Sequence, residues 1–203
     1  QCREYLWMDT YRYVGEWGQM CLKEIIRTYI RRPEYQYVVW LRLAQYALGR
    51  YAHIFLRIYS AIRLKMIRNR TGIQISPNTR IGKGFKIGHS GSIVINPAVT
   101  IGECCDIIQT CTLGLAYRGK NEGVPHLGDR VYIGPGARVI GNVHVGNDVA
   151  IGANAVVTKD APDNAVVAGV PARILSMAGS EGYIYNHLDK DGVIHPRFEW
   201  KMK

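Results

Sequence analysis

The sequence predicts a mainly β protein, a parallel β-helix made of hexapeptide repeats, with an α-helical segment before it. From Ile75 onward, Ile, Leu or Val recurs at six-residue intervals thirteen times, with two interruptions, and Gly follows eight of these residues. Neither the strand period of about two nor the helical period of about 3.6 predicts this spacing, whereas a parallel β-helix does. The chain before Gly72 lacks the period and is instead basic and rich in Tyr and Trp. We therefore expect a helical segment at 1–71, the β-helix at 72–175 and a tail at 176–203.

The composition is that of a globular protein. Of the 203 residues, 47% are hydrophobic and 21% are charged, which excludes a wholly disordered chain. The longest stretch without charge, 87–102, contains many small or polar residues and is shorter than the roughly twenty apolar residues of a membrane-spanning helix. Five cysteines are too few and too scattered for a disulfide framework, so we expect a reducing, cytoplasmic environment.

Two amphipathic helices are expected in the N-terminal segment. The first, Tyr35–Leu48, follows Pro33 and ends at Gly49, in agreement with the usual places of proline and glycine at helix ends. The second, Tyr51–Arg68, has polar residues at spacings of three and four, which form a basic stripe opposite an apolar one. Both helices are expected to bury an apolar face.

The net charge of +10 is concentrated in this segment, which contains thirteen Lys and Arg but only five Asp and Glu through Gly72. The favoured interpretation is a helix that packs on the core and solvates its arginines. The alternative is peripheral contact with an anionic membrane, at its inner, cytoplasmic face, because a basic face bordered by Trp and Tyr is typical of interfacial helices. No nucleic-acid motif accompanies the charge, so no nucleic-acid partner is expected.

Within 72–175, the repeated aliphatic residue and the residue two places before it are expected to point inward, and the glycine after it to allow a tight corner. Cys105 and Cys111 fall on this inner face and are expected to behave as small core hydrophobes. Thr79 is the one polar residue at an inner position. The period slips at His89–Ser92 and again at 114–123, which must leave the coil as a loop. A rigid scaffold interrupted by insertions is expected to carry its function at the insertions.

Four motifs resemble the hexapeptide-repeat acyltransferases, specifically their serine acetyltransferase-like branch. They are Ile87-Gly-His89, Thr112-Leu-Gly114, Val131-Tyr-Ile-Gly134 and Ala168-Gly-Val-Pro-Ala-Arg173. The resemblance covers about residues 72–175. It implies a left-handed coil, here of roughly four turns, and a homotrimer with active sites between neighbouring subunits, with the pairing of trimers left open.

The resemblance also implies an O-acetyltransferase that uses acetyl-CoA as co-substrate. An alcohol is a poor nucleophile near neutral pH, so a base must remove its proton, and His89 matches the family's catalytic histidine. Backbone N–H groups around Gly114 are expected to stabilise the negative oxygen that develops on the thioester. For coenzyme A, matching positions near the end of the coil are Ala153, Lys159, Gly169, Pro171 and Arg173.

Departures from the family pattern concern the acceptor. The Asp that orients the catalytic His is replaced by Gln74, an Asp of the amino-acid pocket by Gly88, and an Arg-His pair by Gly123 and Val124. Free serine would leave its charges poorly compensated in such a site. We therefore expect a sugar hydroxyl of a surface-polysaccharide precursor as acceptor. The alternatives are a serine O-acetyltransferase of cysteine biosynthesis with a rebuilt pocket, and an inactive binding or assembly module on the same fold.

His126 either replaces the lost histidine in binding the acceptor or is a surface residue, and both interpretations remain open. No metal is expected, because His144 should face outward with no second histidine close to it, whereas catalytic zinc needs three converging ligands. In the tail, Glu181–Asn186 and Asp189–Ile194 alternate enough to predict a hairpin around Asp191-Gly192. The tail is expected to cover the open end of the coil or to pack on a neighbouring subunit.

Overall fold

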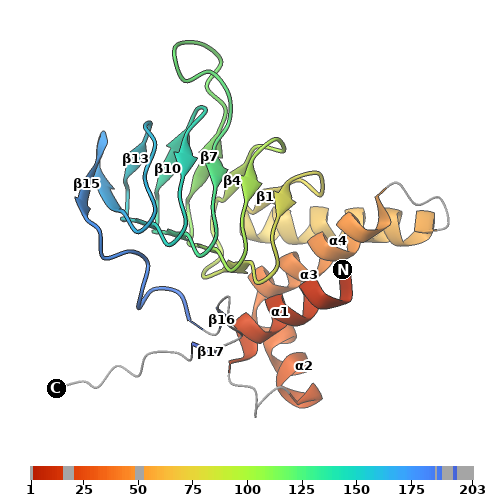
Figure 1. The fold of residues 1–203 in the computed structure, drawn as a ribbon. Coiled ribbons are helices and arrows are strands. Elements are labelled where there is room, and N and C mark those ends of the chain that lie inside the picture. Colours follow the sequence, from red (N-terminus) through yellow and green to blue (C-terminus); the bar gives the residue numbers. More distant parts are fainter. Residues whose placement is uncertain (1, 16–20, 49–52, 186, 189–193, 196–203) are drawn as a thin grey trace.

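The computed structural model describes residues 2–15, 21–48, 53–185, 187–188 and 194–195. Within these residues, four helices lie at one end of an elongated coil of short strands (Figure 1). They are α1 (Cys2–Val14), α2 (Leu22–Arg31), α3 (Pro33–Ala47) and α4 (Ile54–Thr71). The two expected helices are therefore present as α3 and α4, although α4 begins and ends three residues later than predicted. No helix in the described part of the chain has the length and apolar character needed to cross a membrane.

The coil is the expected left-handed parallel β-helix, with three parallel sheets as its sides. The first sheet contains β1 (Gln74–Ile75), β4 (Val94–Ile95), β7 (Thr112–Gly114), β10 (Arg138–Ile140) and β13 (Val156–Val157). The second contains β2 (Arg80–Ile81), β5 (Thr100–Ile101), β8 (His126–Leu127) and β11 (His144–Val145). The third contains β3 (Lys86–Ile87), β6 (Asp106–Ile107), β9 (Tyr132–Ile133), β12 (Ala150–Ile151) and β14 (Val166–Gly169), and β15 (Ala172–Ser176) joins it antiparallel.

The coil makes nearly five turns, so the prediction of roughly four was too low. Five strands stack in the first sheet, one from each turn. The last turn does not follow the six-residue period because it is shorter. Ala161, only four positions after Val157, pairs with Val145. Val167 of β14 then completes the turn on the third sheet. A search for six-residue spacing ends at Val157 and misses both residues.

The core follows the predicted inner face. All thirteen repeated aliphatic residues are buried, and so are the residues two places before them. Cys105 and Cys111 are completely buried, as expected. The Thr79 hydroxyl is also buried and has no hydrogen-bond partner within the described residues. The alternation of inner and outer side chains therefore determines the core from Ile73 to Val167.

The repeated glycines serve a different purpose from the one predicted. None of the eight that follow an aliphatic residue has a positive φ angle; the left-handed corner residues lie two places further on, as at Gly84, Cys104 and Arg130. Instead, these glycines allow adjacent turns to approach closely. A Cβ atom on Gly102 would lie 2.4 Å from the carbonyl oxygen of Gly128 on the next turn. Glycine is thus required by the spacing between turns rather than by conformational freedom.

The helices close the open edge of the first turn. The strands of this turn have no preceding turn to accept and donate their backbone hydrogen bonds, and unpaired strand edges are costly when buried. The Tyr37 hydroxyl of α3 bonds both the N–H and the carbonyl of Ile75, each at 2.9 Å. Arg42 donates to the Ile81 carbonyl at 2.8 Å, and its guanidinium is paired with buried Asp9 at 2.7 Å. The cap therefore uses polar side chains of α1 and α3 in place of a further turn.

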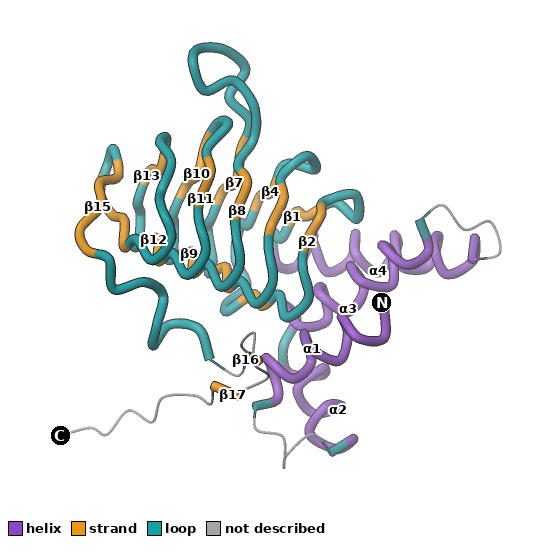
Figure 2. Tube along the Cα trace, in the orientation of Figure 1, coloured by secondary structure: helices purple, strands orange, loops and turns teal. Residues whose placement is uncertain are grey.

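The tail turns back along the coil toward the helices (Figure 2). Gly179 N–H donates to the Asn164 carbonyl, and Ser180 bonds Asp148 and Arg130 on the two preceding turns. Glu181–Tyr183 form a turn rather than the predicted strand. A short antiparallel pair joins β16 (His187–Leu188) and β17 (Ile194–His195), while the predicted Asp191-Gly192 turn lies outside the described residues. The tail thus runs along the coil and does not simply cover its open end.

Candidate functional site

His89 lies in the corner that follows β3, with its ring exposed. Two contacts hold this corner from the helical side. The Tyr13 hydroxyl donates to the Ile87 carbonyl at 3.1 Å and accepts from the Ile87 N–H at 2.7 Å. The Ser90 hydroxyl donates to Glu34 Oε2, in the first turn of α3, at 3.1 Å. Within the described residues the His89 imidazole has no hydrogen-bond or ion-pair partner, so both nitrogens are available to a ligand.

The Tyr13 hydroxyl can form hydrogen bonds with both the N–H and the carbonyl of Ile87 because it is a neutral phenol. Burial raises the pKa of its hydroxyl well above the ordinary value, since the charged phenolate would lose its hydration. A neutral hydroxyl carries one proton to donate and lone pairs to accept. The backbone before His89 is thereby held by α1 on the side where the coil has no preceding turn, while the Gly88 N–H donates to the Ile107 carbonyl of the next turn.

A cavity of about 520 Å³ opens beside His89. The end of α1 and Arg32 border it on the helical side, the third sheet lines it, and the tail contributes Tyr183 and Tyr185. Its charged lining residues are Arg12, Arg32, Lys86 and Asp106. The insertion that carries His89 therefore meets the cap and the tail at one place.

Arg12 and Asp106 neutralise one another within this cavity. Both are buried, and their side chains form an ion pair. Arg12 also donates to the carbonyl oxygens of Gly84 and Cys104, at 3.0 and 2.9 Å. These bonds satisfy part of a guanidinium that would otherwise be costly to bury. Arg12 and Asp106 consequently support the cavity wall without adding net charge.

Lys86 supplies a cation that has no carboxylate partner among the described residues. Its ammonium lies 3.9 Å from the ring centroid of Tyr185 and its side chain is buried. Tyr183, two residues earlier in the tail, stacks on Tyr132 of β9 at 4.6 Å between centroids. Arg32 provides a second, half-exposed cation, 3.3 Å from Glu34. The His89 cavity can therefore accept an anionic group on a ligand.

Gln74 and Gly114, two of the predicted site residues, line a different groove. This groove, of about 810 Å³, runs between the first sheet and α4 and is also lined by Thr112, Lys65 and Arg68. Neither of these two cavities contains both His89 and Gly114. The predicted base and the predicted oxyanion donor therefore line different cavities of one subunit.

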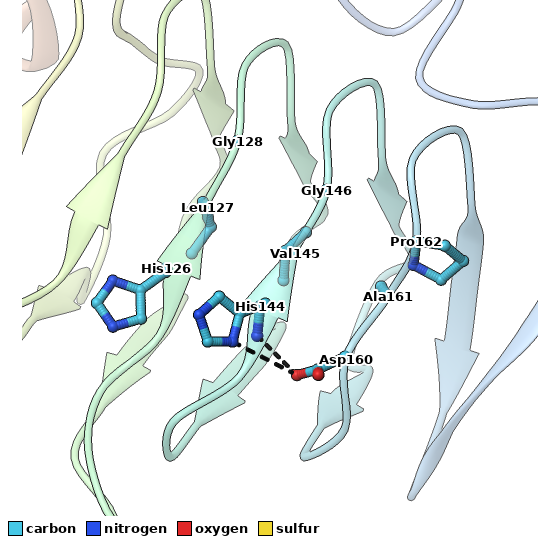
Figure 3. A pocket seen from close by; sticks show the side chains of 9 residues that line it. All are labelled: His126, Leu127, Gly128, His144, Val145, Gly146, Asp160, Ala161 and Pro162. Carbon is cyan, nitrogen blue, oxygen red and sulfur yellow. Dashed lines mark hydrogen bonds and ion pairs between the residues drawn. The ribbon is translucent and has the colours of Figure 1, made fainter.

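His126 and His144 lie side by side on the outer face of the second sheet (Figure 3). Their ring centroids are 5.2 Å apart, His126 Nδ1 is 2.9 Å from the Thr100 hydroxyl, and His144 Nδ1 is 3.9 Å from Asp160. The expectation that no second histidine would lie close to His144 is wrong, because strands β8 and β11 are neighbours although eighteen residues separate the histidines. Within the described residues, no cluster of three or more metal-ligating side chains is present.

The residues predicted to bind coenzyme A lie toward the last turns of the coil. Ala153, Lys159, Gly169 and Arg173 are exposed. In the part of the chain that the structure describes, neither Lys159 nor Arg173 has an ion-pair partner, so both charges can meet phosphate groups. Gly169 has a φ of 96°, which favours glycine, and the peptide bond between Val170 and Pro171 is cis.

The loop that leaves the coil after β7 reaches over these turns. It projects from the side of the coil (Figure 1) and is closed by a bridge between Ala116 and Gly123. The Asn121 side chain donates to the Thr158 carbonyl at 2.6 Å, and Asn121 also accepts from the Asn142 N–H. Lys120, in the same loop, is thereby brought near the corner that carries Lys159.

Sequence reasoning missed the residues that the cap and the tail bring to His89. Lys86 and Asp106 occupy outward hexad positions, where a charged residue is ordinary. Arg32 and Glu34 flank Pro33 at a helix start, and the two tail tyrosines lie beyond the repeat. Only the unusual number of tyrosines was visible as a signal, and it did not indicate a partner.

Comparisons with known proteins agree with this fold. A family model described as bacterial transferase hexapeptide (six repeats) matches residues 125–159. The serine acetyltransferase of Staphylococcus epidermidis is 34% identical over 167 residues, covering 81% of this chain and 74% of that protein. The serine acetyltransferase of Synechococcus elongatus is 33% identical over 147 residues, covering 72% of this chain but only 59% of its own length.

Solved structures of serine acetyltransferases also resemble this chain. The Neisseria gonorrhoeae serine acetyltransferase in complex with serine is 26% identical, with a TM-score of 0.69, and covers 87% of this chain and 69% of its own. Isoform 3 of the Entamoeba histolytica enzyme, in complex with cysteine, is 34% identical, with a TM-score of 0.61, and covers 79% of this chain and 55% of its own.

These similarities contradict the prediction of a polysaccharide-type acetyltransferase with a sugar acceptor. The relatives and the solved structures described above are all named serine acetyltransferases, and the matches cover between 72% and 87% of this chain, more than the coil alone. The physical argument behind the prediction was the loss of charged residues at four positions. That argument considered only the positions of the family motif and left out the cations that the folded chain brings to the His89 cavity.

Proposed function

Because this chain belongs to the serine acetyltransferase family, we propose that it transfers the acetyl group of acetyl-CoA to the hydroxyl of L-serine. In this reaction the serine oxygen forms the new ester bond, the thioester C–S bond breaks, and free coenzyme A leaves with a proton. The observation that carries the proposal in this chain is the His89 cavity, where an unpartnered imidazole and an unpaired cation lie together.

His89 acts as the general base. Its exposed ring has no competing partner among the described residues, and the contacts of Ser90 and Ile87 hold the corner that carries it. A positioned base of this kind contributes about 10² to 10⁴ in rate. Gln74 cannot supply the negative charge with which a carboxylate would orient the imidazole, so its orientation depends on the corner itself.

Lys86 and Arg32 bind the serine carboxylate. Free serine carries a carboxylate that the replaced Arg-His pair would have met, and Lys86 and Arg32 are the cations of the cavity that the Arg12–Asp106 pair does not use. Arginine and lysine both form charge-assisted hydrogen bonds with carboxylates. The pocket is thus rebuilt by one residue of the coil and one of the helical cap.

Acetyl-CoA supplies the activated acetyl group. Lys159 and Arg173 meet its phosphates, while Ala153, Gly169 and Pro171 shape the wall beside it. Backbone N–H groups around Gly114 donate to the thioester oxygen. Lys159 and Arg173 are exposed and have no ion-pair partner within the described residues, which fits their assignment to the phosphates. Since His89 and Gly114 line different grooves of one subunit, the complete site forms between two neighbouring subunits of a homotrimer, and His126 of the second sheet is available to the acceptor there.

The test is release of coenzyme A from acetyl-CoA with L-serine as acceptor. We expect saturable, serine-dependent release, and a loss of at least about 100-fold in kcat for His89→Ala. His53→Ala, at the start of α4, is the matched control and should retain the parent rate. Release that does not depend on serine, or an unchanged kcat in His89→Ala, would overturn the proposal.

A further inference from the structure

Helix α4 carries an apolar face that nothing in the described structure covers. The helix packs on the protein through Ser60, Leu64, Ile67 and Thr71, which are buried. With about 3.6 residues per turn, these four positions share one side of the helix. The opposite side consists of large apolar residues that are mostly exposed: Ile54 44%, Phe55 85%, Ile58 52%, Tyr59 52%, Ile62 51% and Met66 55%.

Basic residues border this apolar face along both of its sides. At about 100° per residue, Arg57, Lys65 and Arg68 follow one border, and Arg63 and Arg70 follow the other. The helix contains no Asp or Glu. The Arg63 guanidinium lies over the ring of Trp40, 5.4 Å from its centroid, and Tyr59 contacts the same ring edge to face. An apolar stripe thus lies between two basic rows, with aromatic rings at one border.

The charges decide what kind of partner fits. A second copy that packed its own α4 face to face on this one, about a two-fold axis, would bring the same five cations opposite one another without a carboxylate on either helix, and such like-charge contacts are destabilising. A negatively charged, apolar-lined surface satisfies both features at once. The interface of a bilayer that contains anionic lipids has this character, since acyl chains lie beneath acidic headgroups.

We propose that α4 lies on an anionic lipid surface, with Phe55, Ile58, Ile62 and Met66 at the boundary between headgroups and acyl chains and the two basic rows against the headgroups. The contact is peripheral. Each cation close to such a surface and each apolar side chain below it adds to binding. The apolar side chains of this face line neither the His89 cavity nor the Gly114 groove, and the proposal does not depend on the acceptor of the reaction.

Sedimentation with lipid vesicles tests the proposal. The full chain is mixed with vesicles of phosphatidylcholine alone and with vesicles that contain about one third phosphatidylglycerol. We expect binding to the anionic vesicles only, and weaker binding as salt is raised, because screening reduces the attraction of exposed charges. The double variant Phe55→Ser/Ile62→Ser should reduce binding at least tenfold. Leu175→Ser, which removes an exposed leucine from β15, should bind like the parent.

A second variant separates the charges from the apolar face. Arg57→Gln/Arg70→Gln, which changes one residue of each basic row, should lower binding to anionic vesicles and flatten its salt dependence while leaving the apolar stripe intact. Light scattering after size exclusion is measured on all variants, and so is serine-dependent release of coenzyme A. Absence of vesicle binding by the parent overturns the proposal. If the parent fails to bind and Phe55→Ser/Ile62→Ser also lowers the molecular mass, the face belongs to a second copy of the chain.

Discussion

Glu34 accepts a 3.1 Å hydrogen bond from the hydroxyl of Ser90, so the residue after His89 is tied to the first turn of α3. Glu34 is buried, and its other oxygen is 3.3 Å from Arg32. The helical cap is therefore in direct contact with the corner that holds the proposed base. A buried carboxylate is costly unless it has partners. Glu34 has two, Ser90 and Arg32, so the cap holds the corner in addition to covering the end of the coil.

Ser90→Ala removes this bond and should loosen the corner. Hydrogen bonds to charged groups contribute about 1.5–3 kcal/mol, and part of that loss should appear as poorer positioning of His89, about a tenfold fall in kcat with little change in KM for acetyl-CoA. Ser90→Thr keeps a hydroxyl and should restore most of the rate. Steady-state kinetics measure both, and an unaltered kcat in Ser90→Ala would show that the corner is held by other contacts.

Lys86→Met should weaken binding of the acceptor. Methionine retains most of the length of the side chain but removes the charge proposed to meet the serine carboxylate. We expect KM for serine to rise about tenfold, a cost of about 1.4 kcal/mol, while KM for acetyl-CoA stays close to the parent value. Lys83→Met is the control: Lys83 lies on the same turn but pairs with Glu4 outside the cavity. Equal effects of the two substitutions would contradict the role of Lys86.

Gly102→Ala should destabilise the coil by about 3 kcal/mol or more, because a Cβ atom there would lie 2.4 Å from the carbonyl oxygen of the next turn. Gly119 has no atom within 4 Å of the place of a Cβ, although its φ is 99°. Gly119→Ala should therefore cost only the backbone strain, about 1 kcal/mol. Urea unfolding of both variants measures the difference, and comparable losses would mean that backbone conformation, not spacing between turns, requires glycine.

The core cysteines should resist alkylation in the folded protein. Burial raises the pKa of Cys105 to about 12 and raises the pKa of Cys104 and Cys111 as well. Because the thiolate is the reactive form, we expect iodoacetamide at about pH 8 to label exposed Cys21 and to leave the three buried cysteines, Cys104, Cys105 and Cys111, unmodified until urea is added. Mass spectrometry of the digested protein gives the positions of the label.

The same pKa shift makes stability depend on pH. In the unfolded chain, a free thiol has a pKa of about 8.5. Above that pH, the folded state keeps a proton on Cys105 that the unfolded state loses, so the free energy of unfolding falls as pH rises toward about 12. Urea midpoints should decrease between about pH 7.5 and 10, and Cys105→Ala should reduce the slope. Cys21→Ala should leave it unchanged.

The repeat of aliphatic residues by itself determined the architecture of the coil. Because side chains alternate between the two faces of a strand, a local pattern was sufficient to place Ile87, Cys105 and Val139 in the core. The motif around His89 and the two insertions were also visible without coordinates. These features depend on residues that are close together along the chain, and such features can be read from order and spacing.

Only the tertiary structure decided how the His89 cavity is built. Its wall depends on Arg12 and Asp106, which are 94 residues apart, and its remaining charges and rings come from the cap, the coil and the tail. The stacking of His126 on His144 and the close approach of Gly102 to the next turn likewise depend on the register between turns. Contacts of this kind arise from packing between distant segments. A one-dimensional period carries no information about which distant side chains will share a cavity, and for that reason the acceptor could not be judged from the missing motif residues alone.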